Sequence, residues 1–241
     1  MFGSLDRSGI LAIAAEAADV SASAEPSSGD TRQALGRRFS IALPFGCEGP
    51  LRDDQQDATG WRYDESSQAL RVQFAPVTWR TTDWRFRSED EVSFEGFWIA
   101  RPWTTSEACP VPTDAEPRDG GPITLPGQTL AIGQAVDGDA SAPQAGTKPP
   151  YVAVVRVPPA DLRAERGFAI RLKGRLAVVR YGGPVGCVQP GGSEQRPICL
   201  IGATFDEIVL ENAATGETLA RWSGIGKGRV GSAAISNLPQ P

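Results

Sequence analysis

Apolar and polar residues alternate one by one along much of the chain, and this period of two constrains the fold more than any other feature. It is clearest in residues 38–43, RFSIAL, and in residues 70–75, LRVQFA. Successive side chains of a β-strand point to opposite faces, so the alternation predicts strands that bury one face and expose the other. An amphipathic helix would instead need apolar residues three or four positions apart.

Such segments recur and are separated by residues that favour turns. We expect strands within residues 60–74, 91–103, 151–157, 167–183 and 203–224. Gly174 is expected to break its segment into two strands or a bulge, and only residues 158–167 suggest a helical turn within the body of the chain. Many short strands and little helix predict an all-β fold, an antiparallel β-sandwich or a jelly-roll-like arrangement.

The composition changes at both ends and in the middle of the chain. Residues 1–34 are rich in Ala and Ser, with at most a short helix over residues 8–19, and are expected to form a flexible tail. A single β-rich domain follows over residues 35–232, and residues 233–241 form a C-terminal tail. Residues 110–150 contain eight prolines and six glycines, so we expect a long surface loop there, with a linker between two β units as the alternative.

The four cysteines, Cys47, Cys109, Cys187 and Cys199, lack the close pairs and the histidines of common zinc sites. We expect Cys187 to bond with Cys199 across a Gly- and Pro-rich loop, an effect of about 3 kcal/mol in the chain-entropy model. Cys47 and Cys109 then form the second disulfide, which implies an oxidising compartment, periplasmic or extracellular. Four unpaired structural cysteines and a four-thiolate site stay open as alternatives.

The absence of histidine removes the commonest general base and the commonest metal ligand. Catalytic Ser-His-Asp or Cys-His sites and HExxH zinc sites are therefore excluded. The net charge of -5 argues against nucleic acid as a partner. No apolar run approaches the roughly 18 residues that would span a membrane. Residues 10–26 carry a short apolar patch interrupted by Glu16, which leaves an intact signal, a trimmed signal, a mis-assigned start and a plain tail as alternatives.

Several partial motifs fall short of a site. Residues 226–231, GKGRVG, match a glycine-rich nucleotide fingerprint but lack the βαβ unit that it must open, so we expect a flexible basic turn. Asp137 and Asp139 are too few for a calcium site. The adjacent carboxylates Asp206 and Glu207 point to opposite faces of a strand and cannot pair as glycosidase acids. We therefore expect no cofactor, no metal and no catalytic residue.

Aromatic residues gather in one region, because five of the six tryptophans lie within residues 61–103. Residues 78–87, TWRTTDWRFR, interleave aromatic rings with arginines, a pattern that permits cation–π stacking. The candidate binding residues are Trp79, Trp84, Arg85, Arg87 and Trp103. Three interpretations remain: these rings fill the core, contact another protein, or form a platform for a sugar.

These features favour a non-catalytic accessory or structural protein of the bacterial cell envelope that acts through contacts with another envelope protein. Arginine supplies almost all cations and Ala, Gly and Pro are abundant, a composition typical of high-GC bacterial genes. A glycan-binding β-module and a carboxylate-based carbohydrate-active enzyme are the alternatives. A glycan module should expose two or three tryptophans on one face, so the solvent exposure of Trp79, Trp84 and Trp103 discriminates between them.

Overall fold

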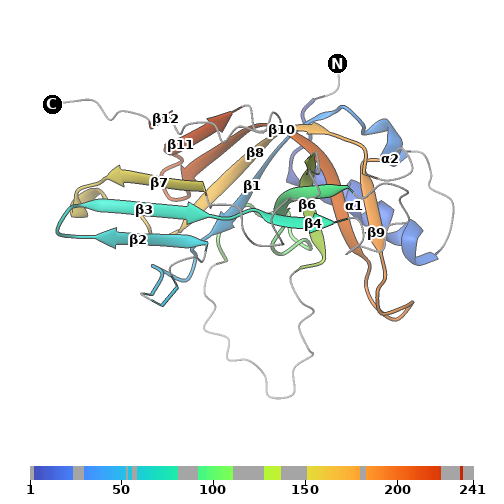
Figure 1. Ribbon diagram of the computed structural model, residues 1–241, viewed down its shortest axis with the longest axis horizontal. Helices are drawn as coiled ribbons and strands as arrows, with labels where there is room; N and C mark the ends of the chain where they lie inside the picture. The colour runs from blue at the N-terminus through green and yellow to red at the C-terminus, as the bar shows by residue number, and fades with distance from the viewer. Residues whose placement is uncertain are drawn as a thin grey trace.

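A computed structural model of the chain describes residues 3–23, 30–52, 54–55, 59–80, 92–110, 128–136, 151–179, 183–223 and 234–235. Over these residues the chain is mostly β-strand and forms a nine-stranded and a three-stranded sheet (Figure 1). The all-β, sandwich-like fold predicted from the alternation is thus confirmed.

The strands are β1 Arg38–Phe45, β2 Gly60–Asp64, β3 Ala69–Phe74, β4 Val77–Arg80, β5 Ser93–Trp98, β6 Leu130–Val136, β7 Tyr151–Arg156, β8 Phe168–Leu176, β9 Val185–Val188, β10 Ile198–Asn212, β11 Thr218–Ser223 and β12 Ala234–Ile235. The helices are α1 Arg7–Ser23 and α2 Asp30–Gln33, with a 3-10 turn, η1, at Pro159–Asp161. Each predicted strand segment contains at least one of these strands, and η1 falls where the helical turn was expected.

Strand β10 is the spine of the larger sheet, whose strand order is β1-β8-β10-β6-β5-β4. The first part of β10 pairs with β9 and with β6, and its later part lies between β8 and β11. The pairing of β10 with β6 is parallel, unlike the antiparallel arrangement expected from the sequence. A parallel pair needs a long crossover, and here β7, β8 and β9 lie between the two strands along the chain.

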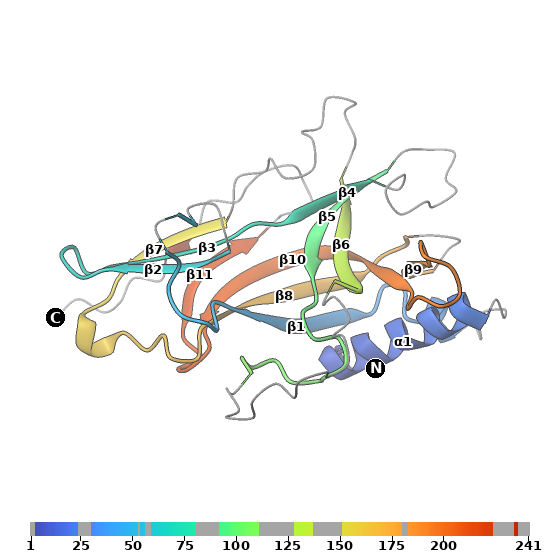
Figure 2. The ribbon, with the colours of Figure 1, turned by 90° about the horizontal axis from the view of Figure 1, so that it is seen from below.

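The smaller sheet, β2-β3-β7, lies at one end of the molecule and α1 at the other (Figure 2). The inward residues of both sheets form one core, to which the alternating Phe39, Ile41 and Leu43 contribute as predicted. The aromatic ring of Phe74 on β3 lies 5.5 Å from that of Trp222 on β11, centroid to centroid. Apolar burial between the two sheets therefore holds the sandwich together.

Gly174 does not break β8, which runs unbroken through it, but the register of the opposite strand shifts between Phe205 and Glu207. A Cβ at Gly174 would lie 2.0 Å from the backbone oxygen of Thr204. The bulge predicted at this glycine is therefore found in its partner strand, where the two backbones approach too closely for a side chain.

The N-terminal segment differs from the expected flexible tail over residues 1–34. Helix α1 packs against β1, β9 and β10, and its residues Ile10 and Ala14 are buried in the main core. Leu5 forms a parallel bridge with Phe39 of β1. Ile10 and Ala14 are one helical turn apart and so lie on the same face of α1. This narrow apolar face is enough to dock the helix, although the helix contains few large apolar residues.

The Pro- and Gly-rich segment 110–150 was expected to be a long loop, but its only apolar stretch forms β6, an inner strand of the larger sheet. Both faces of β6 are buried over Leu130–Gln134, so apolar and polar residues do not alternate there. Ala234 and Ile235, within the expected C-terminal tail, form β12. The remaining residues of that tail lie outside the described part of the chain.

Both predicted disulfides are present, and no cysteine is free. Cys187 and Cys199 occupy directly paired positions on β9 and β10. Cys47 and Cys109 join the segment after β1 to the segment after β5, across 62 residues of sequence. Disulfides of this kind are typical of oxidising compartments. Neither of the described helices is long and apolar enough to cross a membrane.

Candidate interaction surface

Of the five candidate binding residues, the structure describes Trp79 and Trp103, and these two lie in different environments. Trp79 is buried, with 7% of its surface exposed, whereas Trp103 is 62% exposed. Trp84, Arg85 and Arg87 lie outside the described residues. The structure therefore separates Trp103 from Trp79 as a candidate for binding.

Trp79 belongs to a small apolar cluster on the larger sheet, which corrects its assignment as a binding residue. Its ring meets that of Trp98 edge to face at 5.3 Å, and Phe94, Ala131 and Leu200 are the other buried residues of the cluster. A Cβ on Gly133 would lie 3.3 Å from the Trp79 ring. Because glycine has no side chain, the Trp79 ring can pack closely over this position. Trp61 and Trp222 are also buried, in the main core, as the core interpretation expected.

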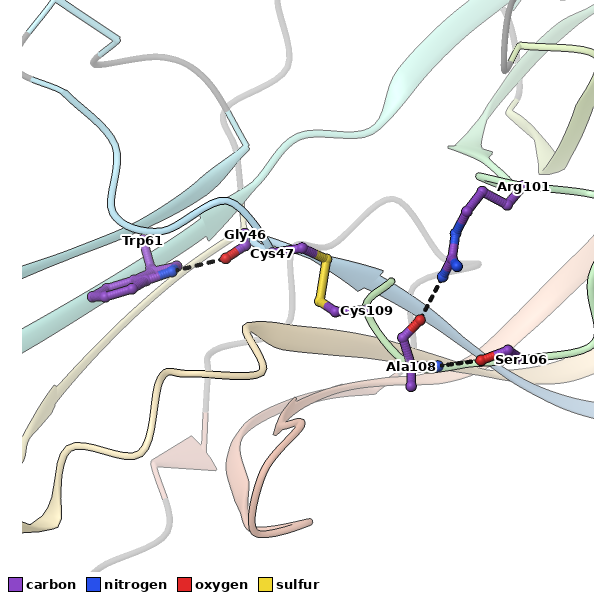
Figure 3. Close-up of a disulfide and its surroundings, with 7 residues drawn as sticks. All are labelled: Gly46, Cys47, Trp61, Arg101, Ser106, Ala108 and Cys109. Atoms are coloured by element: carbon purple, nitrogen blue, oxygen red, sulfur yellow. Dashed lines mark hydrogen bonds between the residues drawn. A yellow bond between two sulfur atoms is a disulfide. The ribbon is translucent and has the colours of Figure 1, made fainter. Parts of the chain in front are cut away.

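Trp103 lies in the segment that follows β5, residues 99–110, which we call the Trp103 loop. The loop is fixed to the fold at both ends: Ile99 donates its backbone N–H to the Leu130 carbonyl at 2.8 Å, and Cys109 is bonded to Cys47. Within the loop the Arg101 guanidinium donates to the Ala108 carbonyl (Figure 3). An exposed tryptophan is therefore presented on a loop that is attached to the fold at both ends.

Glu107 connects the Trp103 loop to the edge of the larger sheet. Its carboxylate accepts a hydrogen bond from the Ala42 backbone N–H at 2.8 Å and lies 3.5 Å from Nη1 of Arg171. Ala42 is on β1, whose outer edge would otherwise present this donor unpaired. The side chain thus protects a sheet edge and anchors the loop. No local pattern marks this role in the sequence, because the partners are 65 residues apart.

Arg7, the first residue of α1, contacts the Trp103 loop although the two are far apart in the sequence. It is 3% exposed. Its Nε donates to the Thr104 carbonyl at 2.9 Å, and its Nη2 donates to the carbonyls of Ala100 at 2.7 Å and Arg101 at 3.2 Å. The pKa of Arg7 is lowered, mainly by burial, and the negative charge of Glu107 opposes this shift. Arginine stays protonated in proteins, so a buried cation holds this loop.

The outer face of β8, β10 and β11 carries ion pairs rather than a catalytic pair. Glu207 accepts from Lys173 and from Arg221, each at 2.8 Å, and the hydrogen bond from Lys173 is the main cause that lowers the pKa of Glu207. The three described carboxyls whose pKa clearly shifts, Asp64, Glu165 and Glu207, all shift downward. A glycosidase acid needs a raised pKa, so none of these three suits that role.

A polar cleft of about 560 Å³ lies within the segment that joins β1 to β2. Its polar lining includes Glu48, Arg52, Gln55 and Thr59. Gln55 already accepts a hydrogen bond from the Arg52 backbone N–H at 3.1 Å, so part of this lining is used to hold the loop itself. Asp53 and residues 56–58 of the same segment lie outside the described residues.

The described part of the chain holds no group of three or more His, Cys, Asp or Glu residues that could bind a metal ion. Asp137 and Asp139, the pair considered for calcium, lie outside it. Comparison with known proteins adds no functional assignment, because no protein-family model, curated protein or solved structure matches the chain.

Proposed function

We propose that the protein is a non-catalytic component of the bacterial cell envelope that binds another envelope protein through the Trp103 loop. The observation that carries this proposal is the 62% exposure of Trp103 on a loop fixed by a disulfide, by Glu107 and by Arg7. Tryptophan is the residue type most enriched at the energetic centres of protein interfaces.

The exposed area of Trp103 and the fixed conformation of its loop both favour binding. Covering the exposed part of one tryptophan, roughly 150 Å², contributes about 4 kcal/mol at 25 cal/mol per Å². A loop that is already ordered loses little conformational entropy when it binds, so more of that contribution remains as affinity. A fixed, exposed tryptophan is therefore better suited to recognition than one on a loop that must first become ordered.

The envelope assignment rests on two observations. The two disulfides fit an oxidising compartment, and the arginine-rich, Ala-, Gly- and Pro-rich composition is typical of high-GC bacterial genes. In such an organism the periplasm or the cell exterior is the compartment in which both disulfides would persist.

The glycan-binding alternative receives less support from the described residues. Their exposed large apolar side chains are Trp103, Val154 and Val178, so among the described residues no second exposed ring accompanies Trp103 to form a flat sugar platform. A single anchor on a fixed loop fits insertion into a pocket of another protein better than stacking against a chain of sugars.

Site-specific photo-cross-linking tests the proposal. A photoreactive residue replaces the exposed Thr105, two positions from Trp103, in cells that produce the protein naturally. We expect one dominant adduct with another protein, and we expect Trp103→Ala to reduce its yield at least about tenfold, the effect of losing roughly 1.4 kcal/mol or more. The matched control places the photoreactive residue at Val154, which is exposed on β7.

The proposal is wrong if Trp103→Ala leaves the adduct unchanged while the purified variant keeps the melting temperature of the wild type. It is equally wrong if the Val154 position gives the same adduct in the same yield, because the cross-link would then report proximity without a specific surface. If an oligosaccharide alone, without a protein competitor, abolishes the adduct, the Trp103 loop binds a glycan instead.

A further inference from the structure

Arg7 makes contacts that a helix does not need for its own stability. Its Nε and Nη2 atoms donate to three backbone carbonyls, all in residues 100–104 of the Trp103 loop, while its buried Nη1 atom makes no hydrogen bond to any described residue. Burying a charged group without a directly bonded carboxylate is unfavourable. The arrangement stabilises the loop instead, because the guanidinium binds three of its carbonyls at one point.

The turn that Arg7 holds has an unusual backbone. Arg101 has a φ of 48°, in the left-handed region that residues other than glycine seldom adopt. Its carbonyl accepts from the Thr104 backbone N–H at 3.2 Å and also from Arg7. Three carbonyl dipoles that converge on one point repel one another unless a cation lies between them. The conformation that projects Trp103 outward therefore depends on the Arg7 guanidinium.

The helix that carries Arg7 is anchored independently of the loop. Leu5 exchanges backbone hydrogen bonds with β1, donating to Arg38 and accepting from Ser40, each at 2.8 Å. Ile10 is buried in the main core. The Asp6 carboxylate caps the first turn by accepting from the Gly9 backbone N–H at 2.9 Å. The position of Arg7 is thus fixed by contacts that do not involve the Trp103 loop.

We infer that Arg7 is a positioning residue for the Trp103 loop: it holds the carbonyls of residues 100, 101 and 104 together and so sets the direction in which Trp103 projects. The consequence for binding rests on the function proposed above. The effect on the loop itself does not, because it is a property of this chain alone. The N-terminal segment thereby controls a surface about a hundred residues away in the sequence.

Hydrogen exchange of the purified protein tests the effect on the loop. Arg7→Met keeps the length of the side chain and removes its donors, and we expect exchange of the Thr104 amide to rise at least about tenfold. Arg7→Lys should fall between Met and the wild type, because one ammonium nitrogen cannot reproduce a fork of donors. The control is Ile10→Val, which weakens the packing of the same helix without removing a contact to the loop. It should leave Thr104 exchange close to that of the wild type.

The same variants are then introduced into the protein with the photoreactive residue at position 105. We expect Arg7→Met to reduce the Trp103-dependent adduct at least about fivefold, with Arg7→Lys between. Unchanged Thr104 exchange in both Arg7 variants would overturn the inference and leave the proposed function standing. Raised exchange with an unchanged adduct would overturn the positioning role in binding. If Trp103→Ala keeps the adduct, the proposed function fails, and the exchange data alone decide whether Arg7 positions the loop.

Discussion

Trp79 and Trp103 begin from similar local sequences and end in opposite environments. Each is a tryptophan close to an arginine; Trp79 lies within β4, and Trp103 lies in the segment that follows β5. Trp79 lies over Gly133 and against Trp98 in a buried cluster, while Trp103 projects from a turn built around the Arg7 guanidinium. The difference teaches that distant segments act on each tryptophan: β6 supplies a glycine beneath the Trp79 ring, and α1 supplies a cation that binds backbone carbonyls of the turn carrying Trp103.

The largest effect is expected for Trp79→Ala. Removing a buried tryptophan leaves a cavity against Trp98 and Gly133, so we expect the free energy of unfolding to fall by about 3–5 kcal/mol. Chemical denaturation measures it. A loss below about 1 kcal/mol would mean that the Trp79 ring is not packed as described, and it would return Trp79 to the list of candidate binding residues.

Removing the Cys47–Cys109 disulfide by a double change to Ser should come next. The disulfide closes 62 residues and Cys187–Cys199 closes 12, so the chain-entropy model gives roughly 4 and roughly 3 kcal/mol respectively. The two disulfide variants should differ more clearly in which residues show raised hydrogen exchange. Only the Cys47–Cys109 variant should raise hydrogen exchange across residues 99–110, and an equal rise in both variants would contradict the role of that disulfide in holding the Trp103 loop.

Filling the space beneath Trp79 tests the buried side of the comparison from the opposite direction. The Cβ of Gly133→Val would lie 3.1 Å from the Glu95 backbone oxygen and 3.3 Å from the Trp79 ring, and overpacking of this kind should destabilise the fold by about 1–3 kcal/mol. Gly3→Ala is the matched control, because a Cβ there meets no atom within 4 Å. Equal melting temperatures for the two variants would show that the sheet accommodates the side chain.

The smallest effect on stability is expected for Trp103→Ala. An exposed side chain contributes little to folding, so the free energy of unfolding should change by less than about 0.5 kcal/mol. The result combines with that of Trp79→Ala in one denaturation experiment. A loss of 2 kcal/mol or more would show that Trp103 packs against the protein itself, and the surface proposed for binding would then belong to the core.

The predictions from sequence succeeded where the signal is local. Period-two alternation located β1, the β2–β3 hairpin and the β10–β11 hairpin, because the pleat itself imposes that period. The pairing of all four cysteines also followed from the sequence. The alternation gave no warning of β6, since a strand buried on both faces has no polar face to alternate with.

For the candidate site, composition and local context named Trp79 and Trp103 together and could not distinguish the buried ring from the exposed one. Neither Arg7 nor Glu107 could be found, because their partners lie 97 and 65 residues away. The docking of α1, within the expected tail over residues 1–34, was missed for a related reason. A helix with a narrow apolar stripe looks dispensable until the surface that receives Ile10 and Ala14 is known.

By itself the sequence determined an all-β chain, part of its strand segments, its two disulfides and the exclusion of histidine chemistry, because each of these depends on neighbouring residues or on simple presence and absence. Only the tertiary structure decided which tryptophan is buried, where β6 inserts and what holds the Trp103 loop. Those outcomes depend on contacts between residues far apart in the chain, where burial and hydrogen bonding are set by the partner surface and leave no trace in local pattern.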